Sequence, residues 1–172
     1  HYAAATPTPT PSPTASECSS YTELSDAWRN VDFNDGDGGT ENCDSSLSGW
    51  YRFTGDAGTQ MPENAPEKYH CGTHAPGWLS SSHPAPGVSA AATVCYHWSS
   101  STCNWSNQIT VTNCGQYYVY YLTPTPVCSL RYCGEDGAPG PTPKPSLSPT
   151  PQPTSQPTLK PTHDPTLQPT SQ

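Results

Sequence analysis

Aromatic and β-branched residues gather in four short segments in the middle of the chain. These segments are residues 50–53, 93–98, 109–112 and 117–122, and polar or glycine-containing stretches separate them. Runs of this length and composition predict β-strands. Residues 113–116 form a short polar connector between the last two segments, so we expect those two strands to pair as an antiparallel hairpin.

One earlier segment has a different period. Between residues 20 and 28, Tyr21, Leu24 and Trp28 stand at i, i+3 and i+7, which would place them on one face of a helix. We therefore expect one helical turn there. With the strands and the polar stretches between them, the predicted fold class is a mainly β, disulfide-rich small module with long loops.

Proline and cysteine divide the 172 residues into three parts. Of the 22 prolines, 4 precede Cys18 and 11 follow Cys133, whereas all 8 cysteines lie between these two positions, both included. We predict a proline- and threonine-rich stalk at residues 1–17 and a globular eight-cysteine domain at residues 18–133. A second stalk of tetrapeptide repeats is predicted at residues 134–172.

The 8 cysteines stand in a domain with few leucines, isoleucines and valines, which indicates a core too small to hold the fold alone. The even count and the absence of a CxxC pair predict four disulfides formed in an oxidising compartment. We therefore expect an extracellular protein: secreted, in a cell-surface appendage or in the extracellular matrix. Eight cysteines allow 105 pairings, so the connectivity stays open. The predicted bridging residues are Cys18, Cys43, Cys71, Cys95, Cys103, Cys114, Cys128 and Cys133.

The formal net charge is −8, which argues against a nucleic-acid partner, because such proteins neutralise phosphates with basic patches. No apolar stretch approaches the roughly 18 to 20 residues that cross a bilayer, so we expect no membrane span. The chain begins at His1 without a methionine or a signal peptide. This start predicts a processed form or a segment of a longer protein.

Both stalks combine proline with hydroxyl residues at regular spacing. Residues 6–14 alternate the two, and residues 141–172 form eight tetrapeptides, seven of which begin with Pro-Thr. Recurrent proline favours the polyproline II helix, on which a period of four carries successive Pro-Thr pairs around the whole circumference. Such composition is typical of O-glycosylated stalks, and a flexible unmodified linker is the alternative. The predicted O-glycosylation sites are Thr6, Thr8, Thr10, Ser12, Thr14, Thr142, Ser146, Thr150, Thr154, Thr158, Thr162, Thr166 and Thr170.

The tetrapeptide run resembles the hydroxyproline-rich glycoproteins of algal and plant walls and flagellar hairs. The resemblance covers about a fifth of the chain and implies prolines that are hydroxylated and glycosylated. On that basis the expected modified prolines are Pro7, Pro9, Pro11, Pro13, Pro141, Pro145, Pro149, Pro153, Pro157, Pro161, Pro165 and Pro169.

The globular part carries a second resemblance, spread over its whole length and including all eight cysteines. Its motifs besides the cysteines are Tyr21, Leu24, Trp28-Arg29, Gly49-Trp50-Tyr51-Arg52-Phe53, Gly55, Gly58, Thr73, Pro76, Trp78-Leu79, His83-Pro84, Trp98, Trp105, Val111, Tyr117-Tyr118-Val119-Tyr120, Leu122 and Tyr132. The order of these residues resembles the uromodulin-type eight-cysteine extracellular domain. The resemblance implies a non-catalytic extracellular module of proteins that polymerise or display glycans, in which polymerisation belongs to a different domain.

Two groups of residues have the composition of metal sites. The acidic run at residues 32–41 has the oxygen ligands that calcium prefers, but Asp37 stands where an EF-hand loop has glycine and Cys43 where it has glutamate, so a solvated loop is favoured over calcium. Zinc is disfavoured because Cys71 and His74 form a single unmatched pair of cysteine and histidine. We expect structural roles for His83 and His97, and we expect no metal and no cofactor other than covalent glycans.

No catalytic signature occurs in the sequence, so we expect a protein that is not an enzyme. The scattered carboxylates Asp56, Glu63 and Glu67 lie in predicted loops and leave a catalytic alternative open. Asn104-Trp105-Ser106 is an acceptor sequence for N-glycosylation at Asn104.

Four tryptophans have two possible roles. They could stack sugars as a lectin surface or fill a thin core, and core packing is favoured because large aromatic side chains contribute most to a small core. These residues are Trp50, Trp78, Trp98 and Trp105.

The features together predict a structural component of an extracellular glycosylated filament or surface appendage. In this hypothesis a globular bead sits on glycan-coated stalks, and the chains self-associate into a fibre. The alternative is a carbohydrate-binding or adhesive module displayed on a glycosylated stalk.

Overall fold

Seven β-strands form the framework of the domain in the computed structural model, which describes residues 15–34, 36 and 41–137. They are β1 (Thr22–Leu24), β2 (Gly49–Phe53), β3 (Ala75–Leu79), β4 (Ser89–Trp98), β5 (Ser101–Asn113), β6 (Tyr118–Leu122) and β7 (Leu130–Tyr132). Three 3-10 helices accompany them: η1 (Ser16–Cys18), η2 (Ala27–Arg29) and η3 (Gly55–Ala57). The predicted mainly β class with long loops is therefore confirmed. Most of the predicted stalks at residues 1–17 and 134–172 lies outside the described residues. The described remainder belongs to the folded domain, because Ser16 and Glu17 are part of η1, and Gly134 and Glu135 form isolated β-bridges with Asn30 and Gln60.

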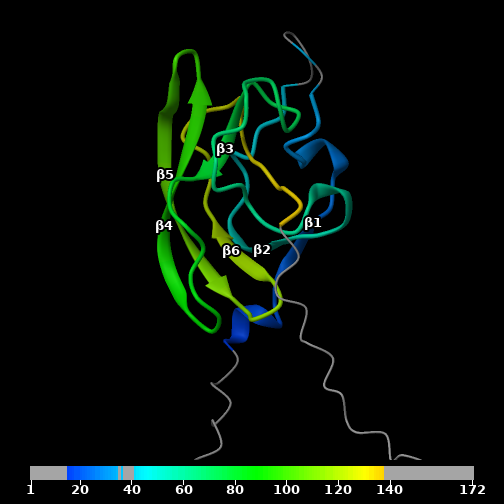
Figure 1. Cartoon of the computed structure of the whole chain (residues 1–172), viewed down its shortest axis with the longest axis vertical. Helices are drawn as coiled ribbons and strands as arrows, with labels where there is room; N and C mark the ends of the chain where they lie inside the picture. The colour runs from blue at the N-terminus through cyan, green and yellow to red at the C-terminus, as the bar shows by residue number, and fades with distance from the viewer. Residues whose placement is uncertain (1–14, 35, 37–40, 138–172) are drawn as a thin grey trace, which may run out of the picture. The chain divides into compact units, whose positions relative to one another are not determined.

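The strands form one sheet in the order β1-β2-β6-β5-β4-β3-β7. β1 pairs with β2 and β3 pairs with β7 in parallel, whereas the four inner pairs are antiparallel. The expected hairpin is the β5–β6 pair, which aligns Asn113 with Tyr118. The longest pair is β4–β5, which forms a ribbon along one side of the domain (Figure 1).

The helical turn expected at residues 20–28 is wrong. Thr22–Leu24 is instead strand β1, and only Ala27–Arg29 turns as a 3-10 helix. Leu24 is buried, whereas Trp28 is 50% exposed, so the two do not share a buried face. Pairing with β2 supplies backbone hydrogen bonds that a single isolated helical turn lacks, and tertiary pairing therefore overrides the local pattern.

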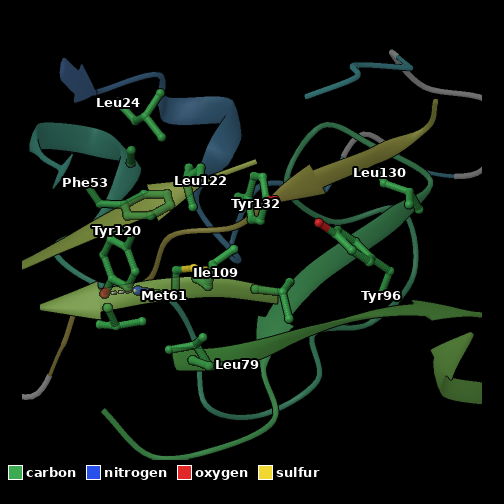
Figure 2. Close-up of a cluster of buried hydrophobic side chains, with 14 of the residues drawn as sticks. Leu24, Phe53, Met61, Leu79, Tyr96, Ile109, Tyr120, Leu122, Leu130 and Tyr132 are labelled. Carbon is green, nitrogen blue, oxygen red and sulfur yellow. Dashed lines mark hydrogen bonds between the residues drawn. The ribbon is translucent and has the colours of Figure 1, made fainter. Parts of the chain in front are cut away.

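The core is built from tyrosines and aliphatic residues. Tyr96, Tyr120 and Tyr132 are fully buried together with Phe53 and Met61, and the rings of Phe53 and Tyr120 meet edge to face with centroids 5.4 Å apart (Figure 2). Each of the three buried hydroxyls has a partner. The Tyr96 hydroxyl donates to Asn107 Oδ1 at 2.9 Å, and the Tyr132 hydroxyl donates to the Thr123 carbonyl at 2.6 Å. A buried hydroxyl needs such a partner, so these bonds permit the burial of the three tyrosines.

All eight cysteines are paired, as expected. The four disulfides are Cys18–Cys114, Cys43–Cys128, Cys71–Cys133 and Cys95–Cys103. The first three join residues 96, 85 and 62 positions apart, and the fourth closes the β4–β5 ribbon over 8 positions. Long closed loops reduce the entropy of the unfolded chain most, so the first three bridges are the main covalent support of this small core.

A buried ion pair holds the loop before β2 against β7. Arg29 donates to both carboxylate oxygens of Asp44, at 2.5 and 3.0 Å, and Asp44 also accepts the backbone N–H of Tyr132 at 2.8 Å. Both side chains are about 5% exposed or less. Arg131 lies beside this pair, and its burial together with the charge of Arg29 lowers its pKa. The network therefore joins segments that are far apart in the sequence.

Candidate functional site

An aromatic pocket of about 200 Å³ lies where the β4–β5 ribbon meets the loop before β7. We define it by its lining residues, which are His74, Ala75, Trp98, Trp105, Val127, Cys128, Ser129 and Leu130. Val127 is 43% exposed, so the pocket has an accessible apolar rim.

Sheet pairing brings these distant segments together. Ala75 of β3 is aligned with Leu130 of β7, and its N–H donates to the Ser129 carbonyl at 3.1 Å. Trp105 of β5 is aligned with Tyr96 of β4. The register then shifts, so that Trp98 lies opposite Ser101. Such bulges redirect side chains, and here both tryptophans line the pocket.

Neighbouring aromatic rings support the wall of the pocket. The imidazole of His74 stacks on Trp98 with centroids 5.9 Å apart and planes at 23°, and Tyr69 meets each of them edge to face at 5.7 Å. Tyr69 and Ser129 have positive φ angles of 67° and 64°. Such conformations are strained for non-glycine residues and concentrate at ligand sites, so the local backbone is held in place by its surroundings.

The lining of the pocket is mainly aromatic and apolar. Neither Trp98 nor Trp105 donates its indole N–H to another group within the described part of the chain. No carboxylate or amide side chain is among the lining residues. The pocket can therefore hold an apolar ring against indole.

A second cluster, Glu63, His83 and Tyr120, was not predicted from the sequence. His83 Nδ1 lies 2.6 Å from Glu63 Oε1, and His83 Nε2 lies 2.8 Å from the Tyr120 hydroxyl, which also accepts the Met61 N–H at 3.0 Å. These contacts fit a neutral imidazole that donates to Glu63 and accepts from Tyr120. Burial lowers the pKa of His83, although hydrogen bonding to Glu63 and its charge oppose the shift.

The pKa values of Glu63 and Tyr120, the two partners of His83, are shifted in opposite directions. Burial raises the pKa of Glu63, but hydrogen bonds from the backbone N–H and imidazole of His83 and from Ser82 outweigh this, so the net shift of that pKa is downward. Burial raises the pKa of Tyr120 well above its usual value. Because Tyr120 is completely buried, its hydroxyl has no access to a substrate, and the cluster serves the fold. The expected structural role of His83 agrees with this arrangement.

The tryptophans predicted to fill the core do not do so. Trp50, Trp78, Trp98 and Trp105 are all partly exposed; Trp98 and Trp105 pack against the core from outside, and tyrosines occupy its centre. Trp78 donates its indole N–H to the Thr102 carbonyl at 2.8 Å. A large indole needs more space than closely spaced strands leave, and partial exposure lets its N–H reach a partner or solvent.

The remaining candidate residues are dispersed. His97 contacts the Pro66 carbonyl at 2.7 Å, and a further histidine, His70, contacts the Val31 carbonyl and Asn34. Asp56 and Glu67 are exposed. Among residues 15–34, 36 and 41–137, no group of three or more histidine, cysteine, aspartate or glutamate residues is placed to hold a metal.

The predicted modification sites are only partly within the described residues. Asn104 is exposed on β5 beside the Cys95–Cys103 bridge, so its predicted glycosylation stays a prediction at an accessible position. The predicted O-glycosylation and hydroxylation sites of both stalks lie outside the described residues. So does most of the glycine-rich half of the acidic run, at residues 35 and 37–40. None of the described helices is long and apolar enough to span a bilayer.

Comparison with known proteins identifies the domain type. Residues 51–134 match the family of uromodulin-like eight-cysteine domains. The chain is 43% identical to the pancreatic secretory granule membrane major glycoprotein GP2 of Rattus norvegicus over 132 residues, which are 74% of this chain and 24% of that protein. It is 42% identical to uromodulin of Mus musculus over 118 residues, which are 67% of this chain and 18% of that protein.

The matched part therefore spans about a quarter or less of the length of these curated relatives. The family match and the four disulfides confirm the predicted resemblance of the globular part. With the secretory relative, they also confirm the expected extracellular location. The resemblance of the stalks to algal and plant glycoproteins stays a prediction.

Proposed function

Because the chain carries a uromodulin-like eight-cysteine domain, we propose that it is a non-catalytic structural or adhesive module of an extracellular glycoprotein. More specifically, we propose that the domain is the globular bead of a glycosylated filament or surface appendage. The sequences flanking it are glycan-coated stalks that supply length and stiffness, and the beads supply contacts between chains.

The observation that supports this proposal is that two pairs of titratable side chains in the domain connect parts of the fold. Arg29 with Asp44, and Glu63 with His83, are buried or half-buried pairs that each connect separate segments of the sequence. Neither pair lines the aromatic pocket. The accessible chemistry of the pocket is aromatic surface, which suits binding rather than acid–base catalysis.

The proposal is tested with the full chain produced in a secretory eukaryotic host. Intact-mass measurement and glycopeptide mapping are expected to show sugars on the threonine and proline residues of the stalks. Sedimentation and electron microscopy are expected to show concentration-dependent association of the chains. A mass equal to that of the bare 18.4 kDa polypeptide, corrected for four disulfides, would contradict the glycan-coated stalk.

A carbohydrate-binding or adhesive module is the second candidate, and the exposed aromatic pocket is the observation that favours it. Glycan-array binding that is lost when the pocket is altered would support this alternative. Binding of the array by neither the protein nor its assembled form would count against it.

A further inference from the structure

We propose that the aromatic pocket binds a Pro-Thr tetrapeptide from residues 141–172 of a second copy of this chain. The inference rests on the proposed structural function, because such docking would be the contact that joins beads. Two independent observations lead to it: the apolar pocket between Trp98, Trp105 and Val127, and the eight tetrapeptides carried by the same polypeptide.

The pocket has the components that recognise proline. Extended proline-rich segments dock in aromatic-lined grooves, where pyrrolidine rings lie against indole and a tryptophan N–H can donate to a peptide carbonyl. Here two tryptophans form the wall, and neither indole N–H is used within the described residues. A tail with the predicted polyproline II conformation would already be extended before binding, so little conformational entropy would be lost when it docks.

The size and lining of the pocket favour a proline ring over a sugar chain. Its volume of about 200 Å³ is below the roughly 300–1,000 Å³ of sites for drug-sized ligands, so it suits one ring better than an oligosaccharide. Sugar hydroxyls need several placed polar partners. Besides the indoles, the polar side chains among the lining residues are those of His74 and Ser129, and no carboxylate or amide side chain is among them.

The tail suits the role of partner in two further ways. Its eight tetrapeptides offer repeated docking positions, so a tail that has dissociated from the pocket still presents another repeat at high local concentration. Lys144, Lys160 and Asp164 are its charged residues apart from the chain end, which gives the tail +1 and leaves −9 of the total −8 on residues 1–140. This difference in charge favours the encounter of a tail with the domain of another copy.

The predicted sugars restrict which face of the tail can dock. Neighbouring residues of a polyproline II helix point about 120° apart, so a sugar on threonine points away from the face of the preceding proline. A sugar on the docked proline would occupy that face itself. The proposal therefore requires at least one proline without a sugar.

The first experiment measures fluorescence anisotropy of a labelled, unglycosylated synthetic peptide of residues 141–172 titrated with the full chain. We expect saturable binding that weakens at least tenfold when every proline of the peptide is replaced by alanine. Val127→Asp in the full chain is expected to weaken binding at least tenfold, because it places a carboxylate on the apolar rim. Val88→Asp is the matched control, because Val88 is 44% exposed and precedes β4, at the opposite end of that strand from Trp98.

A second measurement does not depend on a variant that folds. In the ¹H–¹⁵N spectrum of the wild-type chain, the peptide is expected to shift the indole resonances of Trp98 and Trp105 and to leave that of Trp28 unchanged. Equal binding of the alanine peptide, equal binding by Val127→Asp and wild type, or unshifted Trp98 and Trp105 indoles would each overturn the proposal. Displacement of the peptide by millimolar mannotriose or cellotriose would also overturn it, by assigning the pocket to sugars.

Sedimentation of the full chain separates this inference from the proposed function. Association that is unchanged by Val127→Asp, with no peptide binding, would refute the docking site and leave the structural function standing. Peptide binding through the pocket by a chain that stays monomeric at every concentration would overturn both the filament and the docking between two copies.

Discussion

The buried hydroxyl of Tyr120 provides the sharpest test of how this small core is held together. Tyr120→Phe keeps the ring that packs on Phe53 but removes the oxygen that accepts the Met61 N–H at 3.0 Å (Figure 2). The same oxygen lies 2.8 Å from His83 Nε2. An unsatisfied buried donor costs about 1–3 kcal/mol, and the lost hydrogen bond to His83 about 1 kcal/mol more. We expect the free energy of unfolding to fall by about 2–4 kcal/mol.

The assay is urea denaturation of the disulfide-intact protein at pH 7, followed by tryptophan fluorescence. Tyr121→Phe is the control, because Tyr121 is the next residue of β6, is 40% exposed and makes no hydroxyl hydrogen bond within the described residues. Its substitution is expected to change stability by less than about 0.5 kcal/mol. A loss below about 0.5 kcal/mol for Tyr120→Phe would show that the network around His83 does not contribute to stability.

Three further predictions concern the charges and the bridges. Stability is expected to fall as the pH drops from 7 to 5, because burial holds the pKa of His83 below 6.5 and the unfolded chain binds the proton more readily. The free energy of unfolding then changes by at most about 1.4 kcal/mol per pH unit. In urea denaturation across this range, His83→Gln should reduce that dependence on pH. Asp44→Asn is expected to lower the free energy of unfolding by about 3–5 kcal/mol, because it leaves buried Arg29 without its counter-charge. Asp32 is exposed, so Asp32→Asn should leave the free energy of unfolding nearly unchanged. Equal denaturation midpoints for the two variants would refute this prediction. Replacing Cys18 and Cys114 by alanines is expected to lower the thermal midpoint more than replacing Cys95 and Cys103, because the Cys18–Cys114 bridge closes a far longer loop. The expected difference in the free energy of unfolding is about 2 kcal/mol. The opposite order of thermal midpoints would contradict the entropic explanation.

Most of the candidate site could not have been predicted from local sequence. The pocket needs His74, Trp98, Trp105 and Val127 to meet, and they meet because β3 pairs with both β4 and β7. The turn between β4 and β5 has no Asn-Gly or similar signal, since Ser99 with a φ of 54° occupies it. Local pattern therefore predicts part of β4 and part of β5 but not the long ribbon that they form.

Composition and short-range pattern were sufficient to predict several properties of the domain. The number of cysteines and the scarcity of aliphatic residues were enough to predict four disulfides and an extracellular domain, because a small core requires covalent support. Aromatic and β-branched runs were enough for the positions of β2, β4, β5 and β6, because strand preference is local.

Only the tertiary structure decided which residues are buried and which meet. Tyrosines rather than tryptophans fill the core, because burial depends on strand register and on a partner for each hydroxyl. The cysteine pairing and the contact of Glu63 with His83 and Tyr120 join residues far apart in the chain, which no local pattern encodes. The exposed aromatic pocket is a product of that same long-range pairing.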